Sequence, residues 1–132
     1  FDQSPVSIQI YNRDGYCTYV NDAWEEIFST PKSSLEGYNV FKDQQIKENG
    51  LFDLIKLAYA GEGHHSAPTL FDPKLSNRKG RKRWIELYVF PLKDGNNQVN
   101  EIAIFIVDVT MQMEAHQRTE LSENKFKILA NN

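Results

Sequence analysis

The stretch IAIFIVDVTMQMEAHQ, residues 102–117, joins an apolar run directly to a long polar segment. Residues 102–107 are all apolar, whereas a strand with one face in water alternates apolar and polar residues. Asp108 and Thr110 follow at once, and no glycine or proline occurs after them. The pattern predicts a strand that is buried on both faces and continues directly into a helix.

The composition is typical of one globular domain with a substantial core, because 40% of the 132 residues are hydrophobic and 12% are aromatic. A net charge of -3 gives no sign of a nucleic-acid partner. The single cysteine, Cys17, excludes an internal disulfide framework and is typical of a reducing compartment. No apolar run approaches the roughly 18 residues of a membrane span, so we expect a cytoplasmic domain without membrane contact.

Local sequence patterns predict the strands, turns and helices. Asp14-Gly15 predicts a hairpin turn between strands at 6–12 and 16–20, and Asn21 is expected to cap a helix that starts at Asp22. Gly61 is expected to end a helix that begins at Leu51. Three further strands are expected within residues 66–73, 83–92 and 99–109, the last two joined by a second tight turn. The sequence therefore predicts an α+β fold, a five-stranded antiparallel sheet with short helices on one face.

Four segments, in this order, resemble a PAS domain: YNRDGYCTYVNDAWEEIF, LEGYNVF, LAYAGE and RWIELYVFPLKDGNNQVNEIAIFIVDVT. The resemblance covers residues 4–110, so we expect a PAS sensory domain at 1–110 and a linker helix at 111–132. It implies a non-catalytic module of a bacterial signalling protein, a sensor histidine kinase or alternatively a diguanylate cyclase. Because the chain begins without Met and ends in ILANN, we expect it to be part of a longer polypeptide with adjacent PAS and output domains.

The resemblance also implies a small pocket between the sheet and the helices. Comparison with the light-oxygen-voltage subfamily places alternate residues of the last two strands toward it: Ile85, Leu87, Val89, Ile102, Ile104 and Ile106. Polar contacts to a ligand are expected from Gln9, Tyr11, Tyr38 or Asn39. Such a pocket favours a small apolar ligand or none, and a purely structural relay domain with a filled core stays open as an alternative.

The opposite phase of the same two strands carries an apolar patch of Trp84, Tyr88, Phe90, Phe105 and Val107. A patch of this size is unusual on the surface of a stable monomer. We therefore expect a homodimer through this face, with the N-terminal segment 1–6 near the contact.

The sequence DVT at 108–110 resembles the Asp-x-Thr that ends many PAS domains. We expect Thr110 to cap the outgoing helix, and Asp108 to bond backbone or a basic partner at this junction. That helix should be weakly amphipathic, because residues 116–120 are all polar and leave no continuous heptad seam.

The sequence gives little support to several possible cofactor and binding sites. His64-His65 reads as a solvated turn rather than a metal or haem site, and no histidine lies in the helix at 51–61. The light-sensing signature has a cysteine where this chain has Val40, so there is no flavin or haem signature and the cofactor stays unassigned. His116 lacks the spacing of a histidine-kinase phosphoacceptor. The basic run RKGRKR, residues 78–83, is expected to be a solvated hairpin loop, with anion or nucleic-acid binding as a remote alternative.

Overall fold

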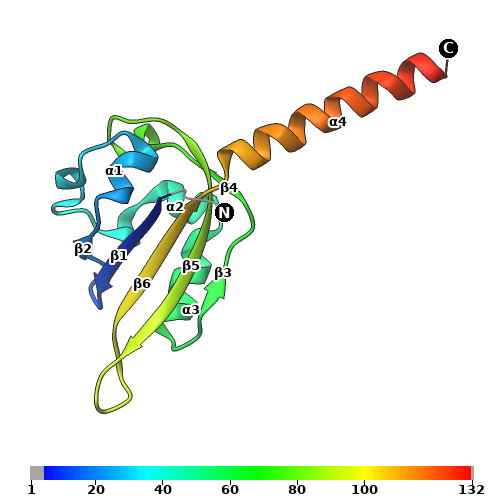
Figure 1. The fold of residues 1–132 in the computed structure, drawn as a ribbon. Coiled ribbons are helices and arrows are strands. Elements are labelled where there is room, and N and C mark those ends of the chain that lie inside the picture. Colours follow the sequence, from blue (N-terminus) through cyan, green and yellow to red (C-terminus); the bar gives the residue numbers. More distant parts are fainter. Residues whose placement is uncertain (1–4, 132) are drawn as a thin grey trace.

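The computed structural model describes residues 5–131, which form a curved antiparallel sheet with helices on one face and a long C-terminal helix (Figure 1). The strands lie in the order β2-β1-β6-β5-β3, and β4 also pairs with β5. Because β3 and β4 pair with successive parts of β5, they share the fifth position of the sheet. The bounds are β1 (Val6–Asn12), β2 (Cys17–Val20), β3 (His64–His65), β4 (Thr69–Phe71), β5 (Arg83–Lys93) and β6 (Val99–Asp108). The predicted α+β fold is confirmed.

Both predicted hairpins are present, and a side chain fixes each turn. Asn12 Oδ1 accepts hydrogen bonds from the backbone N–H groups of Asp14 and Tyr16, at 3.1 and 3.0 Å. Asp94 Oδ1 does the same in the β5–β6 turn, where the N–H groups of Asn96 and Gln98 donate at 2.8 and 3.0 Å. These side-chain oxygens give hydrogen-bond partners to backbone N–H groups that have no backbone partner in the tight turn.

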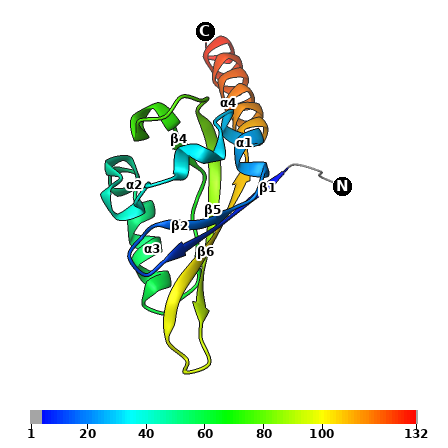
Figure 2. The ribbon, with the colours of Figure 1, turned by 90° about the vertical axis from the view of Figure 1, so that its left-hand side faces the viewer.

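The short helices cover one face of the sheet (Figure 2). They are α1 (Ala23–Phe28), α2 (Gln44–Glu48) and α3 (Leu51–Tyr59), with 3-10 turns at Lys32–Leu35, Val40–Lys42 and Pro73–Ser76. α1 and α3 were predicted, and they bury Trp24, Ile27, Phe28, Leu51, Ile55 and Ala58 against the sheet. Helix α2 was missed, although Asp43 caps it by accepting bonds from the N–H groups of Gln45 and Ile46.

Asn21 does not cap α1, and the prediction that it would is wrong. Its Oδ1 accepts from Ile8 N at 2.9 Å, and its Nδ2 donates to Val6 O at 3.0 Å. Asn21 directly follows β2, so its side-chain amide lies beside β1. The two bonds of this amide replace the hydrogen bonds that a longer β2 would make to β1 through its backbone. Asp22 occupies the N-cap position of α1 without a side-chain bond to the helix.

His64-His65 is also not a turn. The two residues form strand β3, which pairs with Val89 and Tyr88 at the edge of β5. The His65 ring stacks on Tyr88 with centroids 4.2 Å apart, and His65 Nε2 lies 3.1 Å from a carboxylate oxygen of Glu86. The unpaired backbone groups along the edge of β5 explain why this polar segment becomes a strand.

Helix α4 (Thr110–Ala130) leaves the end of β6 and projects away from the domain (Figure 1). Its side chains after Thr110 are exposed or half-buried, as expected of a helix without a continuous apolar seam. Between residues 5 and 131, no helix is long and apolar enough to cross a membrane.

Candidate functional site

An internal cavity of about 40 Å³ lies between the inner face of the sheet and the helices. The sheet contributes Gln9, Tyr11, Phe71, Ile85, Leu87, Ile104 and Ile106 to its lining. The helices and loops contribute Trp24, Phe28, Leu35, Tyr38, Val40, Ile46, Leu51, Ile55 and Arg78. A water needs roughly 10–15 Å³ measured in this way, so the cavity has room for about three waters or a molecule of a few heavy atoms.

Most of the residues predicted for the pocket surround this cavity, but three do not. Val89 and Ile102 are fully buried and belong to the core without lining the cavity. Asn39 lies in a loop and not at the cavity, contrary to the prediction. Its Oδ1 accepts from Phe41 N at 2.9 Å, and its Nδ2 donates to Asp14 O at 2.9 Å. Asn39 therefore caps a 3-10 turn and joins that turn to the β1–β2 hairpin.

Two tyrosines make one side of the cavity polar. Gln9 Nε2 donates to the Tyr11 hydroxyl at 3.2 Å, and the Tyr38 hydroxyl donates to Asp43 Oδ2 at 2.5 Å. Burial raises the pKa of Tyr11 well above its ordinary value, and the neighbouring Tyr38 adds to this. Burial and the Asp43 carboxylate likewise raise the pKa of Tyr38. Both hydroxyls therefore remain protonated and can donate hydrogen bonds.

Arg78 is the charged residue among the lining residues that the sequence did not predict for the pocket. Its guanidinium carbon lies 4.1 Å from the centre of the Tyr38 ring and 5.6 Å from that of Trp24, within range of cation–π attraction. Its Nη2 is buried and has no hydrogen-bond partner. The cavity wall thus contains a cationic donor that the surrounding protein does not fully satisfy.

The basic run at 78–83 forms the predicted loop up to β5, with Lys79, Arg81 and Lys82 exposed, but its arginines also contact the fold. Arg81 Nε donates to Ile27 O at 3.0 Å, and its Nη2 donates to Glu26 O at 2.9 Å. These carbonyls belong to the last turn of α1, where such groups lack partners within the helix. Arg83 Nη1 lies 3.5 Å from Asp108 Oδ2. Arg81 and Arg83 therefore make contacts within the domain, while Lys79 and Lys82 remain exposed.

The predicted signal junction is where β5, β6 and α4 meet. Thr110 N and Thr110 Oγ1 both donate to Asp108 Oδ1, at 2.9 and 2.6 Å. The Thr110 hydroxyl oxygen also accepts from Trp84 N at 2.9 Å, and Val109 N donates to Trp84 O at 2.8 Å. Thr110 is the first residue of α4 and not its cap, contrary to the prediction, because its oxygen faces β5. Asp108 does bond backbone and a basic partner, as predicted.

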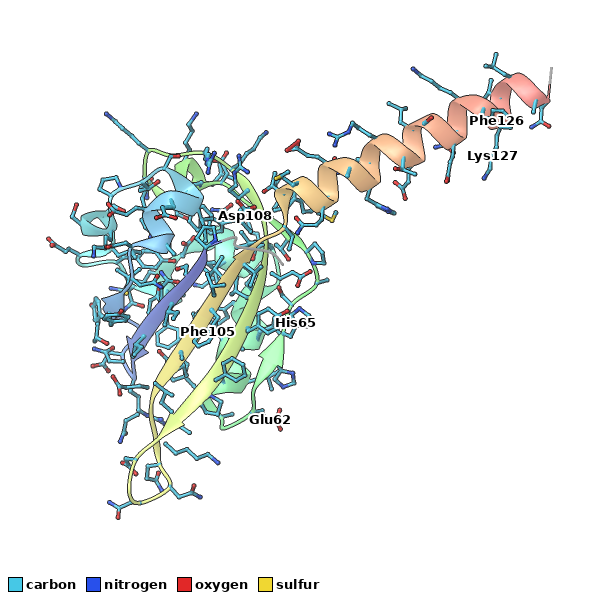
Figure 3. The ribbon with its side chains drawn as sticks, in the orientation of Figure 1. Glu62, His65, Phe105, Asp108, Phe126 and Lys127 are labelled. Carbon is cyan, nitrogen blue, oxygen red and sulfur yellow. The ribbon has the colours of Figure 1, made fainter. Side chains whose placement is uncertain are left out.

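The sheet face away from the helices carries the predicted apolar patch, which we call the outer face. Its residues on four strands are Val6, Ile8, Ile10, Tyr19, Trp84, Tyr88, Phe90, Ala103, Phe105 and Val107. Phe105 lies between its cross-strand neighbours Ile8 and Tyr88, and its ring centre is 5.6 Å from that of Phe90. Figure 3 labels Phe105 on this face, and neither view of the ribbon shows a helix over it within residues 5–131. Of the N-terminal segment predicted near the contact, residues 1–4 lie outside the described part.

Metal binding has no evident site in the described part of the chain, where no three His, Cys, Asp or Glu side chains are grouped to hold an ion.

Comparison with known structures gives many matches. The N-terminal domain of a diguanylate cyclase with a PAS/PAC sensor from Marinobacter aquaeolei has a TM-score of 0.64 at 17% identity, over 82% of this chain and 98% of that one. A domain of a putative light and redox sensing histidine kinase from Haloarcula marismortui has a TM-score of 0.62 at 16% identity, over 83% and 93%. A sensory box histidine kinase/response regulator from Burkholderia thailandensis has a TM-score of 0.59 at 12% identity, over 94% and 92%.

These similarities show the fold, and the sequence itself shows the family. No curated protein matches the chain significantly. The PAS fold family matches residues 1–114, which include every strand of the sheet and the junction with α4. The chain therefore belongs to the PAS fold family.

Proposed function

We propose that this chain is a sensory PAS module that passes a change at its internal cavity to helix α4, and through α4 to an output domain. One observation carries this proposal: two of the strands that line the cavity, β5 and β6, are also the strands that hold the start of α4. Ile85 and Leu87 of β5 face the cavity, and Trp84 of the same strand binds Thr110 and Val109 through its backbone. Ile106 of β6 lies two residues before Asp108. A shift of either strand therefore acts directly on the first turn of α4.

The module is proposed to work as a homodimer through the outer face. Phe90 and Tyr19 on this face are 41% and 51% exposed, which is costly for aromatic side chains in water. Apolar burial is worth about 25 cal/mol per Å², so covering several hundred Å² gives on the order of several kcal/mol before the entropy of association is subtracted. Weak to moderate pairing is therefore expected from the sheet alone, with α4 setting the alignment of the two copies.

The proposed output is a histidine kinase, with a diguanylate cyclase as the second candidate. Both classes occur among the similar structures, whose low identities support the fold and leave the output open. The coding sequence that follows codon 132 tests this part directly. A kinase phosphoacceptor helix and ATP-binding domain would support the first candidate, and a cyclase domain would support the second.

The relay is tested with two matched substitutions in β6. Ile104→Val removes a methylene from the cavity lining, whereas Ile102→Val makes the same change at a buried position outside the cavity. Each costs about 1 kcal/mol of stability. Amide hydrogen exchange of residues 109–116 is then measured by NMR, relative to exchange in the centre of the sheet.

The proposed relay predicts a larger change in the amide exchange rates of the first turn of α4 for Ile104→Val than for Ile102→Val. Equal responses, or no response in either variant, would contradict the relay. That result would favour the alternative of a structural dimerisation domain whose core is filled and whose cavity carries no signal.

A further inference from the structure

We infer that the ligand of this cavity is a short-chain carboxylate, bound through the guanidinium of Arg78. The inference rests on the proposed sensory function and adds to it the chemical class of the ligand. Its starting point is Arg78 Nη2, which is buried and has no hydrogen-bond partner. An unsatisfied buried donor is costly, and the cost is greater when the group is charged. A ligand that supplies an acceptor oxygen would remove this cost.

The charge of Arg78 is not balanced by an ion pair within residues 5–131. Asp43 is the carboxylate bound to Tyr38 on this side of the domain, but its oxygens already accept several bonds. Ser76 Oγ donates to both of them, at 3.0 and 2.8 Å, in addition to the Tyr38 hydroxyl and the amides at the start of α2. Arg78 lines the cavity, whereas Asp43 does not. The cavity wall therefore offers a cationic donor, and an anion is the ligand that complements it.

A second donor lies in the same cavity. The Tyr11 hydroxyl accepts from Gln9, which leaves its own proton available for a further bond. A carboxylate has two oxygens, so it can accept from Arg78 and from Tyr11 at once. The forked guanidinium suits this planar geometry better than an ammonium group would.

The rest of the cavity limits the ligand to a small molecule with an apolar end. Ile85, Leu87 and Ile104 line the cavity, and its volume is about 40 Å³. This volume holds about three or four heavy atoms by the measure that applies to water. Acetate meets both limits, because its methyl group can face the isoleucines. Phosphate is larger and has oxygens on every side, which the apolar wall would leave unsatisfied.

The wall that contains Arg78 also provides the route of entry. A surface groove of about 340 Å³ lies outside the cavity, and Tyr38 and Arg78 line both the groove and the cavity. The two side chains therefore form the partition between them. The Arg78 guanidinium carbon lies 4.1 Å from the centre of the Tyr38 ring, and Arg78 forms no ion pair within residues 5–131, so it can move aside without breaking a salt bridge.

The test is an NMR titration of the 132-residue protein with acetate and with acetamide, its neutral isostere, at constant ionic strength. The side-chain methyl signals of Leu87 and Ile104 and the indole N–H signal of Trp24 report on the cavity. We expect saturable shifts with acetate, and acetamide binding that is weaker by about tenfold or more, because hydrogen bonds to charged groups are the stronger ones.

Three variants identify the binding groups. Arg78→Gln should weaken acetate binding by about tenfold or more, and Arg78→Lys should weaken it less, because it keeps the charge and loses the fork. Lys79→Gln removes the same charge from the exposed neighbouring residue and should leave binding unchanged. Tyr11→Phe provides an independent check if the Arg78 variants fold poorly, and it should also weaken binding.

The outcomes separate this inference from the proposed function. Equal binding of acetate and acetamide, or full binding by Arg78→Gln, would overturn the carboxylate assignment. Absence of saturable shifts with either compound would also overturn it and would indicate that water satisfies Arg78. In each of these cases the relay still stands if Ile104→Val alters α4. Acetate binding without any response in residues 109–116 would instead support the ligand class and contradict the relay.

Discussion

Replacement of Gly80 by alanine tests how closely the segment 78–83 packs on α1. Gly80 has a φ of +143°, a conformation that L side chains rarely adopt. A Cβ at this position would lie 2.1 Å from Thr30 Oγ1 and 2.5 Å from Phe28 O. Thr30 Oγ1 donates to the carbonyl of Lys79, and Phe28 O accepts from Arg81 N at 2.8 Å. The segment can accommodate a methyl group only by moving away and breaking both bonds.

The expected cost follows from these contacts. Backbone strain at an unfavourable φ costs about 1–3 kcal/mol, and each lost hydrogen bond costs about 1 kcal/mol. Gly80→Ala should therefore lower the free energy of unfolding by about 3–5 kcal/mol. Gly37→Ala is the matched control, because Gly37 has a φ of +73° and no atom within 4 Å of the added Cβ. It should cost only the left-handed backbone penalty of about 1–2 kcal/mol.

Urea denaturation followed by far-UV circular dichroism gives both values, and the slope of the transition shows whether the unfolded states are comparable. A loss for Gly80→Ala no greater than that for Gly37→Ala would refute the reasoning. It would mean that the segment is not pressed against α1, and that the position of Arg78 beside the cavity is not fixed by this packing.

Three further predictions concern the dimer, the junction and the pH dependence of stability. Phe105→Glu should give a folded monomer in sedimentation velocity, and a dimer that survives this change would contradict the outer-face interface. Leu75 is an exposed apolar residue outside the outer face, so Leu75→Glu should weaken pairing little. Deletion of 111–132 should weaken pairing modestly. Thr110→Val removes the hydroxyl bonds at the junction, so it should cost about 1–2 kcal/mol and speed amide exchange in the first turn of α4; unchanged exchange there would count against a role in holding the helix. Burial raises the pKa of Tyr59 to about 12, above the value of about 10 in an unfolded chain, so the folded state retains this proton and the free energy of unfolding falls as pH rises from about 10 to 12. Tyr59→Phe should make that fall shallower, and identical slopes for the two proteins would show that Tyr59 does not contribute.

The long strands were predictable because they are runs of β-branched, aromatic and other apolar residues bounded by turn signals. Ile85, Leu87 and Val89 are buried and the residues between them face outward, as the resemblance to the light-oxygen-voltage subfamily implied. The two hairpin turns were equally local, since an Asp-Gly pair is a strong signal for a tight turn. The register of these strands then placed most of the predicted pocket residues around one cavity.

The missed features depend on contacts between distant segments. Arg78 looks like one cation among several in a basic run, and only the arrangement of α1 and the 3-10 turns shows that it enters the cavity wall while Lys79 stays exposed. Asn21 and Thr110 are good helix caps by local preference, but each binds a neighbouring strand instead, because backbone groups of β1 and β5 lie within reach. Helix α2 was different, since Asp43 before it and Gly50 after it were local signals that could have been used.

Because α4 is long, a small tilt of this helix about the hydrogen bonds at the junction moves its far end a long way. A helix of 21 residues at about 1.5 Å per residue is about 30 Å long, so a tilt of about 5° at Thr110 moves the far end by about 3 Å. Phe126 and Lys127 lie near that far end, well away from the sheet (Figure 3). Because the side chains of residues 114–131 are exposed, such a tilt breaks no packed interface along that part of the helix. In the proposed relay, α4 is a lever arm that turns a movement of a few tenths of an ångström beside the cavity into a displacement of about 3 Å at its far end.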